Sequence, residues 1–334
     1  MSRTFIIAEA GVNHNADLDM AHRLIDAAVD SGADAIKFQT AIPNLVATNL
    51  AQKAIYQNKT SDAGESQLEM IRRIHFPLDA YDGLKLRCES KGIIFLSSAF
   101  DLVSLAYLEK LGLPYHKVPS GEITNLPYLR EIGRYGRPVI LSTGMATMEE
   151  IKASIASLEE GGLPRKQITV LHCTTEYPTP MGEVNLRAMQ SIQSTFSIAV
   201  GYSDHTQGIE VAIAAVAMGA TVIEKHFTLD RKLPGPDHKA SLEPKELTAM
   251  VAAIRNIETA LGDGIKRPTP SEARNKPVVR RSLVASRAII AGEAFTSDNI
   301  TTKRPGSGIS PMRWDSVIGK EALHDFAPDE MIDL

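Results

Sequence analysis

The sequence predicts an α/β protein, a (β/α)8 TIM barrel followed by a small β-rich C-terminal domain. Eight short runs rich in Val and Ile alternate with amphipathic stretches of helical length, a pattern typical of strands joined by helices. These units occupy about 260 residues, close to the ~250 residues of a typical barrel. A doubly wound open sheet is the alternative, but no G-x-G-x-x-G motif follows the first strand, which weakens its dinucleotide-binding form.

The expected strands are enriched in the β-branched residues that favour extended structure. In chain order they are TFIIAEA from Thr4, DAIKFQT from Asp34, GIIFLSS from Gly92, YHKVPSGE from Tyr115, PVILSTG from Pro138, ITVLHCTTE from Ile168, SIAVGYSDHT from Ser197 and ATVIEKHF from Ala220. Most of them are separated by amphipathic segments, so we expect the strands to be parallel and covered by helices.

Three of the intervening segments carry helix signals. Residues 147–162 open with Thr147 and Glu150 at capping-box spacing and stop at a Gly pair. Residues 243–262 place Pro244 in the first turn and end at Gly262. Residues 17–33 place one set of apolar side chains on a single face, namely Leu18, Ala21, Leu24, Ile25 and Ala28.

The chain is expected to divide into a barrel at residues 1–262, a linker at 263–277 and a small domain at 278–334. The linker is polar and Pro-rich. The last segment alternates short β-like pieces with Gly/Pro turns. At about 57 residues it is small for a core that is stable by itself, so we expect it to pack against the barrel or against a partner subunit.

The composition excludes several classes of protein. A formal net charge of −4 gives no reason to expect nucleic acid or an anionic membrane as partner. The longest uncharged apolar run, residues 211–223, is well below the ~20 residues of a membrane span. Cys88 and Cys173 make no disulfide framework, which favours a cytoplasmic location.

Ionisable, hydroxyl and amide side chains stand at the C-terminal ends of the strands, where (β/α)8 barrels carry their chemistry. They include Glu9, Lys37, Gln39, Ser98, Lys117, Ser120, Glu122, Ser142, Thr175, Tyr177, Ser203, His205, Glu224 and His226. Serine and threonine are also common turn residues, so each one alone is weak evidence. Together they predict a polar site at the barrel mouth.

Two adjacent strands end in histidine, His205 and His226. Side chains alternate along a strand, so Ser203 with His205, and Glu224 with His226, should face inward, while Lys225 faces outward or joins a salt bridge. Two histidines with water or substrate oxygens suit an open divalent metal site rather than a closed zinc site.

Lys37 and Lys117 have two interpretations. A lysine at a barrel mouth can form a Schiff base with a carbonyl substrate, or it can act as a fixed cation for phosphate or carboxylate. Hydroxyl groups from four strands surround the two lysines, which favours an anion pocket for a phosphorylated or dianionic substrate. These hydroxyls belong to Ser98, Ser120, Ser142 and Ser203.

The motifs resemble those of the sialic acid synthases, the bacterial N-acetylneuraminate synthases and their relatives that make legionaminic and pseudaminic acids. The resemblance covers nearly the whole chain. It rests on IIAEAGVNHNAD, IKFQT, KVPSGEITNLPYL, ILSTGMAT, LHCTTEYPTP, GYSDHT, IEKHFTLD, PGPDH and KRPGSGISP. Thr175 and Ser98 depart from some members, which carry asparagine and threonine there, and both retain a hydrogen-bonding group.

The resemblance implies that phosphoenolpyruvate condenses with an open-chain N-acyl mannosamine in the presence of Mn²⁺ or Mg²⁺. His205 and His226 would hold the metal. The phosphoenolpyruvate ligands would be Lys37, Ser98, Lys117, Ser120, Ser142, Thr175 and Ser203. The sugar contacts would be Gln39, Tyr177 and Asp237, and the candidates for proton transfer are Glu9, Glu122 and Glu224.

The C-terminal segment resembles the antifreeze-like (SAF) domain of this family. The resemblance implies a domain-swapped homodimer, in which the small domain of one subunit caps the barrel of its partner. Arg304 would then reach the N-acyl group of the sugar, and VVRRSLVAS would supply the first strand of the small domain.

The sequence leaves the reaction open among several hypotheses. The leading one is an N-acetylneuraminate synthase acting on N-acetylmannosamine. The nearest alternative is an N,N'-diacetyllegionaminate synthase acting on 2,4-diacetamido-2,4,6-trideoxymannose. A Schiff-base pyruvate aldolase and a non-catalytic carbohydrate-binding protein are the alternatives of other classes.

Overall fold

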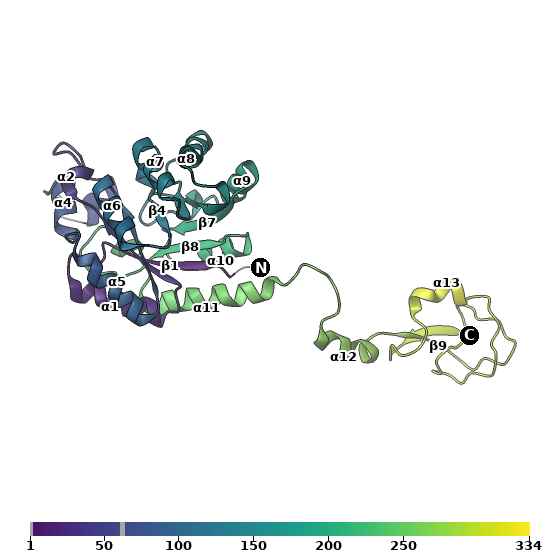
Figure 1. The fold of residues 1–334 in the computed structure, drawn as a ribbon. Coiled ribbons are helices and arrows are strands. Elements are labelled where there is room, and N and C mark those ends of the chain that lie inside the picture. The colour runs from purple at the N-terminus through teal and green to yellow at the C-terminus, as the bar shows by residue number, and fades with distance from the viewer. Residues whose placement is uncertain (1–2, 61–63) are drawn as a thin grey trace. The chain divides into compact units, whose positions relative to one another are not determined.

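The computed structural model describes residues 3–60 and 64–334, and the chain divides into two compact units, Met1–Gly262 and Asp263–Leu334. In the first unit, eight strands of the described chain form a closed parallel barrel, as the sequence predicts. The strands are β1 (Phe5–Gly11), β2 (Ala35–Thr40), β3 (Ile94–Ala99), β4 (His116–Val118), β5 (Val139–Ser142), β6 (Ile168–Cys173), β7 (Ala199–Asp204) and β8 (Val222–His226). Strand β1 pairs with both β2 and β8, which closes the barrel (Figure 1).

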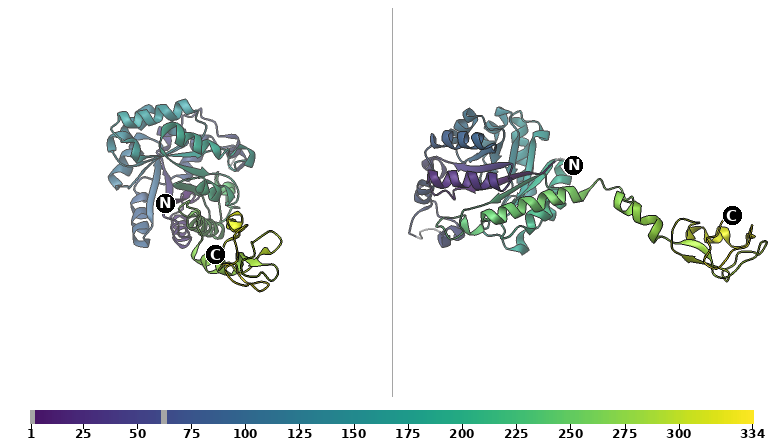
Figure 2. Two further views of the ribbon diagram at one scale, coloured as in Figure 1. Left: turned by 90° about the vertical axis from the view of Figure 1, so that its right-hand side faces the viewer. Right: turned by 90° about the horizontal axis from the view of Figure 1, so that it is seen from below.

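Helices surround the strands (Figure 2, left). The main ones are α1 (Leu18–Asp30), α5 (Ala80–Lys91), α6 (Leu102–Leu111), α7 (Leu126–Tyr135), α8 (Met148–Glu160), α9 (Arg187–Phe196), α10 (Glu210–Ala217) and α11 (Pro244–Leu261). The long connection from β2 to α5 holds α2 (Pro43–Val46), α3 (Ile55–Thr60) and α4 (Gln67–Ile74). Along the described chain, no helix is both long enough and apolar enough to cross a bilayer.

The predicted helix signals are largely confirmed. Thr147 and Glu150 form a capping box at the start of α8, and Pro244 lies in the first turn of α11. Helix α1 buries four of the five apolar residues expected on one face, while Leu18 is 47% exposed. Leu18 is the first residue of α1.

The barrel interior is layered. A buried apolar cluster forms a floor of Ile7, Ala35, Leu96, Ile140, Leu171 and Val222. Because residues two apart on a strand point to the same side, the next inward residue lies one layer higher. These next residues are Glu9, Lys37, Ser98, Ser142, Cys173 and Glu224, and all are buried. The alternation therefore places polar groups at the mouth, above an apolar floor.

The fourth strand is shorter than predicted. Strand β4 covers only His116–Val118, and Ser120–Glu122 forms a 3-10 turn after Pro119. Proline lacks the N–H that a strand ladder needs, so it ends the pairing. Ser120 and Glu122 therefore lie on a turn, where strand alternation does not determine their directions.

The second unit contains a helix that the sequence analysis missed. Helix α12 (Pro270–Val279) lies largely within the segment predicted as a linker, and Thr269 and Glu272 form a capping box at its start. The first strand of this unit, β9 (Ser282–Ala285), begins later than VVRRSLVAS suggested, and it pairs with β10 (Ile300–Lys303). After α13 (Trp314–Val317) the chain completes a separate core that includes Leu283, Phe295, Ile300 and Phe326.

Candidate active site

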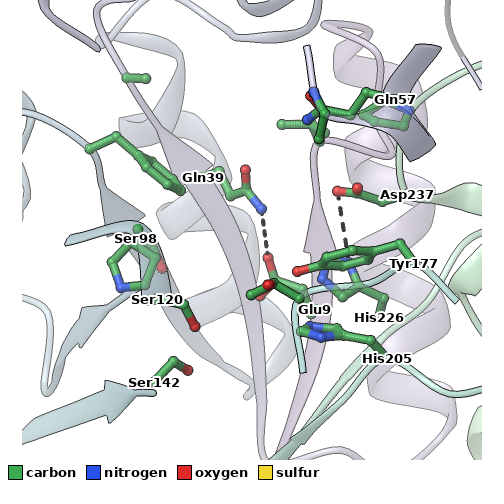
Figure 3. Close-up of a pocket in the computed structure, with 18 of the residues that line it drawn as sticks. Glu9, Gln39, Gln57, Ser98, Ser120, Ser142, Tyr177, His205, His226 and Asp237 are labelled. Carbon is green, nitrogen blue, oxygen red and sulfur yellow. Dashed lines mark hydrogen bonds and ion pairs between the residues drawn. The ribbon is translucent and has the colours of Figure 1, made fainter. Parts of the chain in front are cut away.

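A cavity of about 410 Å³ lies at the C-terminal ends of the barrel strands. Most of the predicted site residues line it, namely Glu9, Lys37, Gln39, Ser98, Lys117, Ser120, Ser142, Thr175, Tyr177, Ser203, His205, Glu224, His226 and Asp237. Figure 3 shows the serines on one side and Tyr177, Asp237 and the two histidines on the other, with Glu9 and Gln39 between them.

Two buried lysines and two buried carboxylates form the centre of the site. Lys37 forms an ion pair with Glu9, and its ammonium lies 3.1 Å from the Ser98 hydroxyl and 3.6 Å from Glu224. The Lys117 ammonium donates to Ser142 Oγ at 2.7 Å and also lies 3.6 Å from Glu224. Ser203 donates to Glu224 at 2.9 Å. Glu224 therefore links both lysines to β7.

The charged groups at this centre shift one another's pKa values. Burial raises the pKa of Glu9 to about 7, despite the opposing effect of Lys37. Burial would also raise the pKa of Glu224, but Lys117 and Lys37 outweigh it and hold that pKa below its usual value. Burial tends to lower the pKa of Lys37, yet Glu224 and Glu9 keep it raised. Burial lowers the pKa of Lys117, although Glu224 opposes this effect. The group thus combines a cation held by two carboxylates, Lys37, with a carboxyl, Glu9, suited to proton exchange near neutrality.

The two histidines at the ends of β7 and β8 face each other, with ring centroids 5.3 Å apart. His205 Nδ1 donates to the Thr174 carbonyl oxygen at 2.6 Å, so its Nε2 carries the free lone pair. His226 Nδ1 is buried and has no hydrogen-bond partner among the described residues. Burial lowers the pKa of both rings, that of His205 to about 4, so both are neutral at pH 7.

Neutral imidazoles with free lone pairs are the form that binds metals, so this pair fits a divalent cation. The described residues contain no cluster of three or more His, Cys, Asp or Glu side chains placed to hold a metal. A cation bound by His205 and His226 would therefore keep most of its coordination for water or substrate oxygens, as in an open catalytic site.

Three of the residues predicted to bind the sugar, Gln39, Tyr177 and Asp237, line the cavity near Glu9 and the histidines. Gln39 Nε2 donates to Glu9 at 3.4 Å, and the Asp237 carboxylate lies 4.0 Å from His226 Nδ1. The Tyr177 ring packs on His205 with centroids 4.1 Å apart. Burial raises the pKa of Asp237 to about 6.

Two glycines allow the close packing of this site. Gly11 has φ +54°, and a Cβ there would lie 3.1–3.4 Å from Glu9 Oε1, Gln39 Nε2 and His226 Cε1. A Cβ on Gly144 would lie 2.4 Å from Thr175 Cγ2. The Gly144 amide also donates to Ser120 Oγ at 3.0 Å, which anchors the turn that carries this serine.

Glu122 is the predicted residue of the first unit that does not join this group. Glu122 is outside the cavity lining, and its carboxylate accepts a hydrogen bond from Asn125 at 2.6 Å. Arg304 is exposed and belongs to the second unit. Their predicted roles stay predictions.

Sequence reasoning missed the part of the cavity wall that comes from the connection between β2 and α5. This part includes Tyr56 of α3, whose ring stacks on Tyr177 at 4.9 Å between centroids, and His75, which follows α4. No strand pattern points to these residues. The only local signal is the capping box of Ser66 and Glu69 that starts α4, and it predicts a helix without showing where that helix packs.

Comparison with known proteins gives a consistent set of matches. Residues 24–266 match the NeuB family, and residues 280–334 match the SAF domain. The chain is 52% identical to the N,N'-diacetyllegionaminic acid synthase of Campylobacter jejuni, over 99% of each chain. It is 43% identical to the enzyme of the same name from Legionella pneumophila, over 94% of this chain and 89% of that one.

A solved structure is also similar, that of N-acetylneuraminic acid (sialic acid) synthetase from Leptospira borgpetersenii in complex with citrate. It is 35% identical to this chain, with a TM-score of 0.71, and the match covers 82% of this chain and 90% of that one.

Proposed function

The chain belongs to the NeuB family and is a phosphoenolpyruvate-dependent nonulosonic acid synthase, and we propose that its product is N,N'-diacetyllegionaminate. The observation that carries this choice is the 52% identity, over 99% of both chains, with a synthase named for that product. The leading hypothesis from the sequence was N-acetylmannosamine as the acceptor sugar. The relatives support the alternative, 2,4-diacetamido-2,4,6-trideoxymannose, better.

In the proposed reaction, C3 of phosphoenolpyruvate bonds to the aldehyde carbon of the open-chain sugar, water adds at C2, and inorganic phosphate leaves. Lys37 and Lys117 would bind the carboxylate and phosphate, assisted by hydroxyl groups. This assignment is supported by the buried ammonium groups and by Ser98 and Ser142 within 3.1 Å of them. Thr175, Ser120 and Ser203 line the same cavity and would complete the phosphoenolpyruvate site.

Glu9 and Glu224 are the proposed groups for proton transfer and for delivery of water to C2. Both carboxylates lie inside the cavity beside the lysines, whereas Glu122 does not line it. Gln39, Tyr177 and Asp237 would orient the sugar hydroxyls and the N-acyl group. The closeness of Gln39 to Glu9 supports a shared position next to the reacting carbon.

His205 and His226 would hold a divalent cation, for which we propose Mn²⁺ or Mg²⁺. When bound, such a cation supplies Lewis-acid polarisation of the aldehyde oxygen. We further propose that the active unit is a homodimer in which Arg304 of one subunit completes the sugar site of the other. The family resemblance supports this arrangement.

The test is phosphate release from phosphoenolpyruvate with Mn²⁺, using the diacetamido trideoxy sugar and N-acetylmannosamine in parallel, each with a chelator control. We expect release with the diacetamido sugar at a much higher kcat/KM, and its loss when the metal is chelated. A preference for N-acetylmannosamine would contradict the proposed product. Covalent trapping of the enzyme with substrate by borohydride would instead indicate a Schiff-base aldolase.

A further inference from the structure

One wall of the cavity is mostly apolar, unlike the lysine and histidine sides. Val12, Met70, Ile71, Ile74 and His75 form this surface, here called the α4 wall, and all five line the cavity together with the polar Gln67 at the start of α4. Val12, Met70 and Ile74 pack together as a small buried cluster, separate from the main core. These apolar side chains are nearly fully buried, and they present an apolar lining of the kind that receives apolar parts of a ligand.

The α4 wall begins next to the sugar side of the site. Val12 directly follows Gly11, which lies close enough to Gln39 and His226 that an added Cβ would crowd both side chains. The wall therefore adjoins the residues proposed for the sugar and the metal. The serine cluster, by contrast, lies across the cavity from His226 and Asp237 (Figure 3).

His75 supplies the one polar atom of this wall that lacks a partner. The residue caps the C-terminus of α4, and its Nδ1 donates to the Ile71 carbonyl oxygen at 3.0 Å. Since Nδ1 carries the proton, Nε2 is a hydrogen-bond acceptor. This Nε2 atom is buried and has no hydrogen-bond partner in the described part of the chain. A buried acceptor of this kind is expected to be satisfied by water or by a ligand.

We propose that the α4 wall selects the sugar, packing against the methyl groups of its C4 acetamido and C6 ends while His75 Nε2 accepts the C4 amide N–H. This assignment rests on the proposed function, because it explains how the site favours a diacetamido trideoxy sugar. N-acetylmannosamine carries hydroxyls at C4 and C6, and these hydroxyls would lose water against an apolar wall. Each buried methyl group is worth about fourfold in affinity.

The first test replaces His75 by leucine and by glutamine and measures KM and kcat for both sugars and for phosphoenolpyruvate. We expect His75→Leu to lower kcat/KM for the diacetamido sugar about tenfold or more, mainly through KM, because the amide N–H loses its acceptor. His75→Gln should recover most of this loss, because its amide oxygen can reach the position of Nε2. The KM for phosphoenolpyruvate should not change in either variant.

The second test uses Val12→Thr, which adds a hydroxyl to the wall at almost constant volume. We expect it to shift the ratio of the two kcat/KM values toward N-acetylmannosamine by about fourfold or more. Val211→Thr is the matched control, because Val211 is similarly buried but lies in α10 away from the cavity lining. It should leave the ratio unchanged.

The outcomes separate this assignment from the proposed function. If the wild-type enzyme does not use the diacetamido sugar, the proposed function fails and the assignment fails with it. If the wild type uses that sugar but His75→Leu keeps the wild-type KM, only the assignment fails. Equal losses for both sugars and phosphoenolpyruvate, together with a lower Tm, would show a structural role for His75 and would also overturn the assignment.

Discussion

Ser97 and Ser98 are neighbours in β3, are both buried, and have different surroundings. Ser98 faces into the barrel, where Lys37 donates to its hydroxyl at 3.1 Å. Ser97 faces outward and shares a 2.7 Å hydrogen bond with Thr40. At the scale of single residues, strand alternation thus decides whether a hydroxyl faces the cavity or the layer between the strands and the helices.

This pair of serines offers a controlled prediction. Ser98→Ala should raise the KM for phosphoenolpyruvate about tenfold or more, because a hydrogen bond to a charged group contributes about 1.5–3 kcal/mol. Ser97→Ala should leave that KM unchanged and lower the free energy of unfolding by about 1 kcal/mol. Steady-state kinetics and urea unfolding of both variants measure these effects. Equal changes in KM for the two variants would contradict the assignment of Ser98 to the anion site.

At the scale of elements, strands β7 and β8 are joined by a buried ion pair behind the two histidines. Lys225 donates to Asp204 at 2.9 Å, and both side chains are fully buried. Asp204 also accepts hydrogen bonds from the backbone N–H and hydroxyl of Thr206, at 2.9 and 2.7 Å. Because Asp204 and Lys225 directly precede His205 and His226, this pair helps to fix the spacing of the histidines.

Breaking this ion pair should lower the free energy of unfolding substantially. Lys225→Met leaves the Asp204 carboxylate buried without its counter-charge, and we expect a loss of about 3–5 kcal/mol in the free energy of unfolding. The double variant Asp204→Asn, Lys225→Met should recover part of this loss, because the neutral amide oxygen still accepts from Thr206. Urea unfolding provides the measurement. A cost below about 1 kcal/mol for Lys225→Met would mean that the pair contributes little to stability.

At the scale of the whole molecule, the chain combines a catalytic barrel with a small unit that has its own core. This core is modest, as expected for a unit of this size, and the unit also carries exposed apolar side chains such as Met312 at 93% and Leu323 at 71%. Together with the family resemblance, this exposed surface supports the proposal that the small domain is completed by a partner subunit.

Mixing two inactive variants tests the proposed dimer. Lys37→Met should inactivate the site in its own barrel, and Arg304→Ala should remove the contact that the small domain makes with the sugar. If Arg304 acts on the partner subunit, each mixed dimer contains one intact site, and an equal co-expression should restore about a quarter of the wild-type activity. Phosphate release by the purified mixture measures the restoration. No restoration above the level of the separate variants would place Arg304 in the site of its own subunit or outside any site.

The sequence by itself determined the eight-strand barrel, the inward direction of Ser203, His205, Glu224 and His226 at the ends of β7 and β8, and the caps of helices such as α8. These features depend on periodicity and on caps, which are local along the chain. The α12 capping box is equally local, yet its Pro-rich, polar surroundings led the sequence analysis to expect a linker. The predicted fourth strand, YHKVPSGE, was likewise too long, because β4 ends before Pro119.

Only the tertiary structure decided which of the polar strand ends meet. In the folded chain Glu224 lies within 3.6 Å of both Lys37 and Lys117. Glu122 instead accepts a hydrogen bond from Asn125 outside the cavity lining. His75, which follows a helix that no strand pattern predicts, joins the lining of the cavity. The physical reason is that closing the barrel fixes distances between residues far apart in the chain, as between β1 and β8. The α4 wall depends on a long connection whose path is set by packing, which no local periodicity encodes.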